Sequence, residues 1–410
     1  MTTETHPHTS AGMKVLLLEN IHSSAHELLE ENGFEVVSLT GALSEAELCE
    51  RVRGVQVLGI RSKTLVTPRV IEAGKSLLSV GCFCIGTNQV DLRAARLSGV
   101  PVFNAPFSNT RSVAEMILAE VVMLARQLGD RAREVHAGRW RKVSAGCFEV
   151  RGKTLGIVGY GHIGSQVGVL AEAFGMRVIF YDIATRLPMG NNRPCGSLAE
   201  LLAHADFVTL HVPATQQTHR MIGAEEIARM KKGSYLLNAS RGTVVQIPAL
   251  AAALKGGRLA GAAVDVYPEE PETNSEGFES ELRGLSNVVL TPHIGGSTVE
   301  AQAAIGREVA ISLVKYIDAG STAGSVNFPE VEPALIPGTH RVLNAHRNVP
   351  GVLRDINRIV SDMGANILGQ VLATDSDIGY LVMDIEREVS EAVSVAMAAL
   401  PTNLRTRVLY

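Results

Sequence analysis

The sequence predicts an α/β protein of several domains, with two successive parallel sheets and a smaller domain at the C-terminus. Its 410 residues exceed what one hydrophobic core usually organises. Short apolar runs alternate with amphipathic, helix-like segments in two blocks, which is typical of parallel sheets with helical crossovers. A glycine-rich motif near the start of the second block is the third observation that predicts this class. The strand-like runs are Val15–Leu18, Glu35–Leu39, Val55–Ile60, Leu77–Cys84 and Val100–Asn104 in the first block, and Thr154–Val158, Val178–Asp182, Phe207–Val212, Tyr235–Ala239, Gly261–Val266 and Val288–Thr291 in the second.

The segments between and after these blocks complete the outline. A helical periodicity from Arg111 to about His136 predicts one long helix that bridges two domains. A second helical stretch covers Ser297 to Ala319, and Pro333–Gly338 is typical of a linker. The tail has the order of elements of a ferredoxin-like (βαββαβ) sandwich. These elements are Arg341–Ala345, Gly351–Met363, Ile367–Ala373, Tyr380–Ile385, Val389–Leu400 and Arg405–Tyr410.

Composition and charge exclude several classes of function. Hydrophobic residues make up 46% of the chain and charged residues 20%, as in ordinary globular proteins with sizeable cores. The formal net charge of -4 provides no general basic field, so binding to nucleic acid or to an anionic membrane has no electrostatic support. No apolar run approaches the roughly 20 residues that span a bilayer. We therefore expect a small-molecule partner, no nucleic acid and no membrane.

The N-terminus and the cysteines suggest a cytoplasmic protein. Residues Met1–Gly12 are polar and lack the basic and apolar regions of a secretion signal, so we expect a disordered extension over 1–12. The five cysteines are scattered and odd in number, which indicates a reducing compartment. Cys82 and Cys84 alternate sides of a strand and no matching His or Cys pair follows, so we expect buried thiols and no metal.

A dinucleotide-binding motif lies in the second block. Gly159-Tyr160-Gly161-His162-Ile163-Gly164 follows the strand that ends at Val158 and opens a helix. Glycines here allow a tight turn and a close approach of the backbone to a pyrophosphate, toward which the helix N-terminus directs its N–H groups. Asp182 ends the next strand, where a carboxylate can accept hydrogen bonds from both ribose hydroxyls and repel a 2′-phosphate. The motif predicts NAD rather than NADP, a preference that Arg186 weakens slightly; a turn-capping residue is the alternative for Asp182.

Chemically capable residues follow three strands of the second block, at the carboxyl ends where ligand sites of parallel sheets gather. Hydride transfer at a carbinol carbon needs a base for the hydroxyl proton, a cation for the carboxylate and oxygen, and a group that tunes the base. His293, Arg241 and Glu270 suit these roles. Taken singly, they are also compatible with a helix cap, a surface ion pair and a solvated turn. The three segments are Asn238–Gly242, Asp265–Pro271 and Thr291–Gly296.

These segments carry a resemblance to a known family. The strings GYGHIG (159–164), NASRGT (238–243), DVYPEEP (265–271) and TPHIGGST (291–298) resemble the D-isomer-specific 2-hydroxyacid dehydrogenases, over nearly all of 13–338. The resemblance implies that Arg241 binds the substrate carboxylate and C2 oxygen, that His293 exchanges the proton, and that Glu270 holds His293 and raises its pKa. It also implies a set of residues around NAD: Gly159, Gly161, His162, Ile163, Gly164, Asp182, Ala239, Ser240, Arg241, Asp265, His293, Ile294, Gly295 and Gly296.

The domain organisation is also implied by this resemblance. Residues 13–108 and 296–337 would form one flavodoxin-like substrate-binding domain, into which 109–295 is inserted as a Rossmann-type NAD-binding domain. Closure of the cleft between them would exclude water. Residues 338–410 resemble an ACT regulatory domain.

Three further strings resemble the members of the family that oxidise 3-phosphoglycerate: GIRSKT (59–64), GCFCIGTN (81–88) and NAPFSNTRSVAE (104–115). A phosphate dianion needs donors and positive charge, for which we expect Arg61, Ser62, Asn109 and Lys142. The expected reaction is oxidation of 3-phosphoglycerate to 3-phosphohydroxypyruvate, the first step of the phosphorylated pathway to L-serine. Reduction of hydroxypyruvate or 2-oxoglutarate is an alternative, because the family shares the trio of Arg241, Glu270 and His293. A non-enzymatic NAD-sensing regulator is another alternative.

Regulation by L-serine is suggested by the tail. The turn 346–351 and Asn366 resemble the serine-binding edge of ACT domains. His346 with the amides of Asn348 and Asn366 can supply the donors and acceptors that an amino-acid zwitterion needs, between the tails of two subunits. An ordinary strand-to-helix turn is the alternative. We expect a homotetramer that assembles through the NAD-binding and ACT domains.

Overall fold

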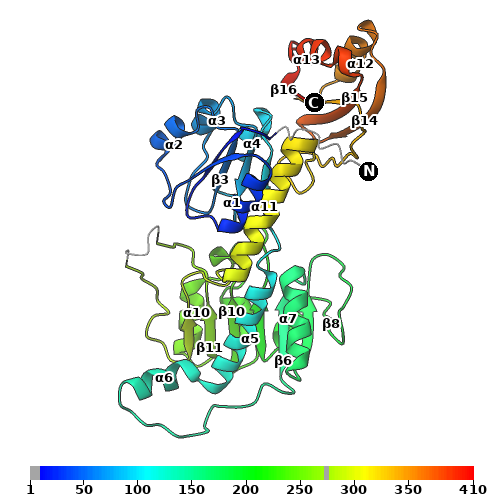
Figure 1. The fold of residues 1–410 in the computed structure, drawn as a ribbon. Coiled ribbons are helices and arrows are strands. Elements are labelled where there is room, and N and C mark those ends of the chain that lie inside the picture. The colour runs from blue at the N-terminus through cyan, green and yellow to red at the C-terminus, as the bar shows by residue number, and fades with distance from the viewer. Residues whose placement is uncertain (1–9, 272–276) are drawn as a thin grey trace, which may run out of the picture. The chain divides into compact units, whose positions relative to one another are not determined.

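The computed structural model describes residues 10–271 and 277–410. The chain divides into two compact units, Met1–Ser108 with Gln302–Tyr410, and Asn109–Ala301. The first contains a five-stranded and a four-stranded sheet, the second a seven-stranded sheet (Figure 1). Of the expected extension 1–12, residues 1–9 lie outside the described residues. Ser10 is fully buried and its hydroxyl donates to the carbonyl of Asn32 (2.5 Å), so the folded chain begins earlier than residue 13.

The five-stranded sheet is entirely parallel, with strand order β2-β1-β3-β4-β5. This order confirms the predicted flavodoxin-like fold. Helix α11 (Val299–Ala319) packs on the sheet: its Val309 and Leu313 join Leu17 and Phe103 in one apolar core. The other elements are β1 Lys14–Leu17, α1 Ser23–Glu31, β2 Glu35–Ser38, α2 Glu45–Arg51, β3 Val57–Ile60, α3 Pro68–Ala73, β4 Ser79–Cys82, α4 Leu92–Leu97 and β5 Val102–Asn104.

The seven-stranded sheet is parallel as well, with the order β12-β11-β10-β9-β6-β7-β8. Counted from β6, its strands have the order 3-2-1-4-5-6 of a Rossmann fold, with β12 added at one edge. The order reverses between β6 and β9, which is the point where such sheets bind dinucleotides. The elements are β6 Thr154–Val158, α7 His162–Ala173, β7 Arg177–Tyr181, β8 Arg193–Pro194, α8 Leu198–His204, β9 Phe207–Leu210, α9 Ala224–Arg229, β10 Ser234–Asn238, η1 Gly242–Val244, α10 Ile247–Lys255, β11 Leu259–Val264 and β12 Val288–Leu290.

The prediction of one long helix over 111–136 is wrong. Two helices, α5 (Thr110–Arg126) and α6 (Leu128–His136), are separated by Gln127, whose φ of 53° is left-handed and interrupts the helix. Helix α5 buries Val113 and Ile117 in the core of the second unit, whereas all nine residues of α6 are at least partly exposed. Among the described residues, no helix is long and apolar enough to cross a membrane.

The C-terminal sheet is antiparallel, with the order β14-β15-β13-β16. It confirms the predicted ferredoxin-like sandwich. Val342 and Met383 lie in its own core with the two helices, whereas Leu343 and Tyr380 share a core with Phe328 of the preceding segment. The sheet is therefore part of the first unit. Its elements are β13 His340–Arg347, α12 Val352–Asp362, β14 Ile367–Thr374, β15 Ile378–Ile385, α13 Ser390–Ala398 and β16 Asn403–Leu409.

A buried ion pair joins this sheet to the linker. Arg341 donates from Nε and Nη2 to the two carboxylate oxygens of Asp384, both at 2.8 Å, and the side chains are 3% and 6% exposed. Its guanidinium also donates to the carbonyls of Ala319 (2.9 Å) and Ala334 (2.5 Å). One cation thus ties β13 and β15 to the end of α11 and to the linker.

Candidate active site

The predicted glycine motif forms a turn that only glycine allows. Gly159 has a φ of 90°, and a Cβ there would lie 2.3 Å from the carbonyl oxygen of His211. A Cβ on Gly164 would lie 2.1 Å from the carbonyl oxygen of Gly159. At Gly161, just before α7, a Cβ would meet no atom within 4 Å. The open space at the helix N-terminus fits a diphosphate, which its N–H groups and dipole favour.

Asp182 follows β7 and lies against this turn. Its Oδ2 accepts a hydrogen bond from the N–H of Tyr160 and its Oδ1 from the N–H of Ala184, both at 2.8 Å. Nε of Arg186 lies 3.6 Å from Oδ2, and the Asp182 side chain is 10% exposed. The carboxylate is fixed beside the glycine turn, a position from which it can bind ribose hydroxyls.

The turn after β10 holds three of the expected cofactor residues. Oδ1 of Asn238 accepts from the N–H (3.1 Å) and the hydroxyl (2.8 Å) of Ser240, and its Nδ2 donates to the carbonyl of Arg241 (3.1 Å). Ala239, between them, and Ile163 on α7 pack partly buried against the core of the second unit. These hydrogen bonds stabilise a tight turn, at the end of which Arg241 has an extended backbone conformation.

Asp265 organises the loop that carries His293. Its side chain lies just after β11 and the residue is 1% exposed. Oδ1 accepts from the hydroxyl of Thr291 (2.6 Å) and the N–H of Ile294 (2.8 Å), and Oδ2 from the N–H of Gly295 (2.8 Å). His293 has a φ of 56°, which is uncommon for a residue other than glycine and occurs often at functional sites. Asp265 thus holds the Thr291 side chain before His293 and the backbone directly after it.

His293 and Glu270 form a hydrogen-bonded pair. Nδ1 of His293 lies 2.7 Å from Oε2 of Glu270, whose Oε1 accepts from the N–H of Tyr267 (3.0 Å). The hydrogen bond with Glu270 raises the pKa of His293 against the opposing effect of burial. Burial alone would raise the pKa of Glu270, but the hydrogen bonds from His293 and Tyr267 outweigh it and lower that pKa. Because Nδ1 is held, Nε2 is the ring atom that can exchange a proton with a substrate.

Arg241 is brought to this pair by a close contact between two loops. A Cβ on Gly242 would lie 2.0 Å from the carbonyl oxygen of Tyr267, so glycine lets the Arg241 turn lie directly against the Glu270 loop. The charge of Arg241 adds to the lowering of the pKa of Glu270 and opposes the rise in the pKa of His293. The three residues therefore lie within electrostatic reach of one another, and together they offer a proton acceptor, a cation and a carboxylate.

Replacing Glu270 with glutamine is expected to lower the pKa of His293, because the carboxylate that favours the imidazolium is lost. His293 acts as a base only above its pKa, so oxidation fails as the pH falls through that pKa. In Glu270→Gln the acidic limb of the kcat/KM profile should therefore move to lower pH, with a lower plateau. Steady-state rates across pH measure this, with Glu269→Gln on the same exposed turn as the control. An unmoved limb would contradict the role of Glu270.

No sequence motif indicates Glu120, yet it lies close to this loop. The residue is 3% exposed on the apolar face of α5, and burial, followed by the charge of Asp265, raises its pKa to about 8. It therefore carries a proton at neutral pH. One turn earlier, Met116 lies against the His293 loop, since a Cβ on Gly295 would be 3.1 Å from its Cε. A helical periodicity with one acid among apolar residues cannot reveal that this acid is buried beside the His293 loop.

The expected phosphate-binding residues do not lie on one element. Arg61 and Ser62 follow β3 in the first unit, and Ser62 is exposed. Asn109 is 8% exposed at the start of α5, and its Nδ2 would lie 2.3 Å from a Cβ on Gly296. The second unit thus places Asn109 beside the end of the His293 loop.

Lys142 lies elsewhere in the second unit. It lines a pocket with Arg126, Arg131 and Trp140, near the C-terminal end of α5. Met116, which contacts the His293 loop, lies on the same helix ten residues before Arg126. The two residues are therefore about 15 Å apart along the helix axis. The structure therefore does not bring Lys142 to His293 within one chain.

The expected effector residues are likewise separated. The His346 ring is 1% exposed, with Nδ1 2.8 Å from Oδ1 of Asn344. Asn348 follows β13, whereas Asn366 precedes β14 at the opposite end of the sheet, on the order of 25 Å away by strand length. Asn348 and Asn366 are both exposed. One chain does not bring the two amides together.

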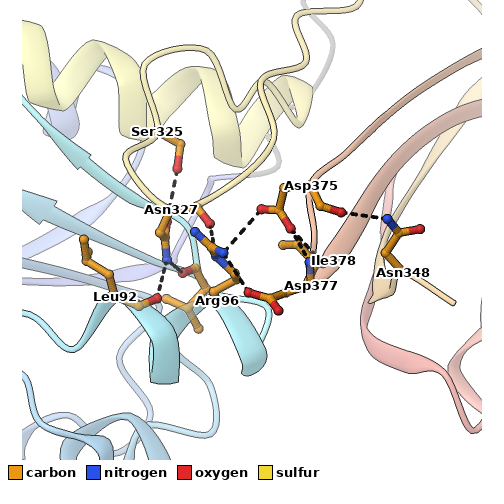
Figure 2. Close-up of polar contacts among 9 residues, drawn as sticks. Leu92, Arg96, Ser325, Asn327, Asn348, Asp375, Asp377 and Ile378 are labelled. Carbon is orange, nitrogen blue, oxygen red and sulfur yellow. Dashed lines mark hydrogen bonds and ion pairs between the residues drawn. The ribbon is translucent and has the colours of Figure 1, made fainter.

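Figure 2 shows how Asn348 is held. Its Nδ2 donates to the carbonyl of Asp375 (2.7 Å) in the turn between β14 and β15. Nη1 of Arg96 on α4 lies 3.1 Å from Asp377 and 3.5 Å from Asp375, and its Nε donates to the carbonyl of Asn327 (2.9 Å). Arg96 therefore joins the end of the C-terminal sheet that carries Asn348 to the five-stranded sheet domain.

Comparison with known proteins agrees with this site. The sequence profile of the D-isomer specific 2-hydroxyacid dehydrogenase NAD-binding domain matches residues 118–295, and that of an AHAS small subunit-like ACT domain matches 343–405. The fold and the site thus define an NAD-dependent dehydrogenase with a C-terminal ACT domain. The chain is 57% identical to the D-3-phosphoglycerate dehydrogenase of Dictyostelium discoideum, over 97% of both chains, and 52% identical to that of Escherichia coli K12, over 97% of this chain and 98% of the other. It belongs to the D-3-phosphoglycerate dehydrogenases within the D-isomer specific 2-hydroxyacid dehydrogenase family.

Solved structures show the same dehydrogenase fold. A protein from Thermus thermophilus matches with a TM-score of 0.69 and 34% identity, over 77% of this chain and 100% of that one. The D-lactate dehydrogenase of Aquifex aeolicus, complexed with NAD and lactic acid, matches with a TM-score of 0.66 and 27% identity, over the same shares.

Proposed function

We propose that the chain oxidises the C2 hydroxyl of 3-phosphoglycerate with NAD and forms 3-phosphohydroxypyruvate, the first step of the phosphorylated pathway to L-serine. The observation that carries this proposal is the His293–Glu270 pair, with Arg241 beside it, in a chain closely similar to named D-3-phosphoglycerate dehydrogenases. None of the five cysteines, all of which lie among the described residues, forms a disulfide, which supports a reducing, cytoplasmic compartment.

The trio divides the work of the reaction. Bound NAD supplies the nicotinamide ring that accepts the hydride from C2. Nε2 of neutral His293 takes the hydroxyl proton, and the Glu270 carboxylate stabilises the imidazolium that forms. The guanidinium of Arg241 binds the substrate carboxylate and polarises the C2 oxygen. In the reverse direction the protonated His293 returns the proton to that oxygen.

Arg61, Ser62 and Asn109 would bind the phosphate from the loops after β3 and before α5. Lys142 can contribute only from a second copy of the chain, because its pocket lies about 15 Å along α5 from the His293 loop. We therefore infer that the enzyme is a homo-oligomer, a tetramer if the C-terminal sheets pair as well.

Substituting Arg61 tests the phosphate assignment. Arg61→Ala is expected to raise the KM for 3-phosphoglycerate by about tenfold or more, because an ion pair with a dianion is lost, and to change the KM for an unphosphorylated 2-hydroxy acid little. Arg69→Ala, an exposed arginine of α3 paired with Glu45, is the matched control. Equal losses for both substrates would place the phosphate elsewhere.

L-Serine is proposed as an inhibitor that binds between two C-terminal sheets. Asn348 of one copy and Asn366 of another would complete one site, because a single chain holds them at opposite ends of its sheet. Asn348→Ala and Asn366→Ala should each abolish inhibition while basal turnover persists. Oligomers that mix the two variants should regain part of the serine inhibition. In them, some sites combine the intact Asn348 of one copy with the intact Asn366 of the other. Wild-type enzyme indifferent to saturating serine, or no recovery in the mixture, would contradict this arrangement.

A further inference from the structure

The carboxylate of Glu19 binds the backbone of the loop that follows β3. Its Oε1 accepts from the N–H of Arg61 (3.1 Å) and of Thr64 (2.8 Å), and its Oε2 accepts from the N–H of Lys63 (3.0 Å). Glu19 is 8% exposed, and this loop carries two of the proposed phosphate ligands. Three backbone donors from four consecutive residues thus converge on one carboxylate. The amide of Ser62 is not among them.

The backbone of Glu19 is itself in an uncommon conformation. Glu19 and Asn20 have φ values of 63° and 52°, two successive left-handed residues that are not glycine. Such residues are strained and persist only where the surrounding structure fixes them. Here the N–H of Glu19 donates to Gly41 (3.2 Å) and that of Asn20 to Leu39 (3.3 Å). These backbone hydrogen bonds fix the position of Glu19 just after β1, so that its carboxylate points toward the loop.

Arg61 is held on its other side as well. Nε2 of Gln89 donates to the carbonyl of Arg61 (2.6 Å), and Gln89 is 4% exposed. Nη1 of Arg61 lies 3.5 Å from the carbonyl of Glu19, at the outer limit of a hydrogen bond. The backbone of Arg61 is therefore fixed by two buried side chains, while its guanidinium is held weakly and can turn to a ligand.

We propose that Glu19 is a positioning residue for 3-phosphoglycerate, which it does not touch: it orders the backbone of residues 61–64 so that Arg61 and Ser62 meet the phosphate in a preformed arrangement. This inference rests on the proposed function. Preformed donors bind an anion without the entropic cost of ordering the loop. The acceptor oxygens of Glu19 point at amides rather than at the guanidinium, so the carboxylate organises the loop without neutralising Arg61 through an ion pair.

The experiment compares Glu19→Gln and Glu19→Ala in the full-length enzyme with NAD. Glutamine keeps one acceptor oxygen and turns an N–H₂ toward the third amide, and alanine removes all three bonds. We expect the KM for 3-phosphoglycerate to rise about tenfold in Glu19→Gln and further in Glu19→Ala. We expect kcat, the KM for NAD and the KM for an unphosphorylated 2-hydroxy acid to change about threefold or less. Glu72→Gln, an exposed glutamate of α3, is the control.

Two results separate the inference from the function on which it rests. If Glu19→Gln lowers kcat and raises every KM together, or leaves the KM for 3-phosphoglycerate unchanged, Glu19 only supports the fold and the inference is wrong, even if Arg61→Ala remains selective for the phosphorylated substrate. If Arg61→Ala loses no selectivity, the phosphate assignment itself fails. Because Glu19→Gln is nearly isosteric, it keeps the test available should Glu19→Ala not fold.

Discussion

Replacing His293 with alanine is expected to lower kcat by about 10²–10⁴-fold, the usual contribution of positioned acid–base catalysis. The ring would be lost, but the glycine turn and Asp182 would be unchanged. NADH should therefore bind with nearly the same affinity, which titration of the coenzyme fluorescence measures beside the steady-state rates. His219→Ala, an exposed histidine of the same unit, should leave both quantities unchanged.

Turnover close to that of wild type in a folded His293→Ala enzyme would remove His293 from the mechanism. A loss of NADH binding as large as the loss of kcat would also contradict the account. His293 would then act by shaping the loop that Asp265 holds.

Replacing Arg341 with alanine is expected to destabilise the C-terminal sheet by about 3–5 kcal/mol, because Asp384 would be left buried without its partner. The carbonyls of Ala319 and Ala334 would lose a donor as well. Hydrogen exchange of the β13 and β15 amides measures this, since Trp140, the chain's one tryptophan, lies in the other unit and would not report it.

The exposed pair of Arg354 and Asp355 is the matched control for that experiment. Arg354 is 76% exposed, so Arg354→Ala should cost no more than about 0.5 kcal/mol. The double replacement Arg341→Met/Asp384→Leu should recover most of the lost stability, because no buried charge remains. Equal protection in Arg341→Ala and Arg354→Ala would show that the buried pair contributes little.

The fold could be predicted from the sequence where the signals are local. Alternating apolar runs and glycine spacing are properties of neighbouring residues, and they predicted both parallel sheets and the dinucleotide turn. The break between α5 and α6 could not be predicted, because the left-handed residue there is Gln127 rather than glycine or asparagine. Strand β8 was missed as well, since it is two residues long and includes Pro194.

The candidate site was predictable where motif strings carry it, at Arg241, Glu270 and His293. Glu19 and Glu120 have no such signal, because each is a single acid beside or within an apolar run and its role depends on contacts distant in sequence. Lys142 reveals another limit: under the proposed function it would act from a second copy of the chain, and a motif within one sequence does not indicate which copy supplies a ligand.

The assigned reaction is tested by supplying NAD with 3-phosphoglycerate that carries deuterium at C2, then measuring the isotope content of the NADH formed and the initial rates. Wild-type enzyme is expected to transfer the C2 deuterium to NADH. Its kcat/KM for 3-phosphoglycerate should exceed that for D-glycerate by about 10²-fold or more, because only the former carries the phosphate dianion. Absence of deuterium from the NADH, or equal kcat/KM for the two acids, would contradict the assigned reaction.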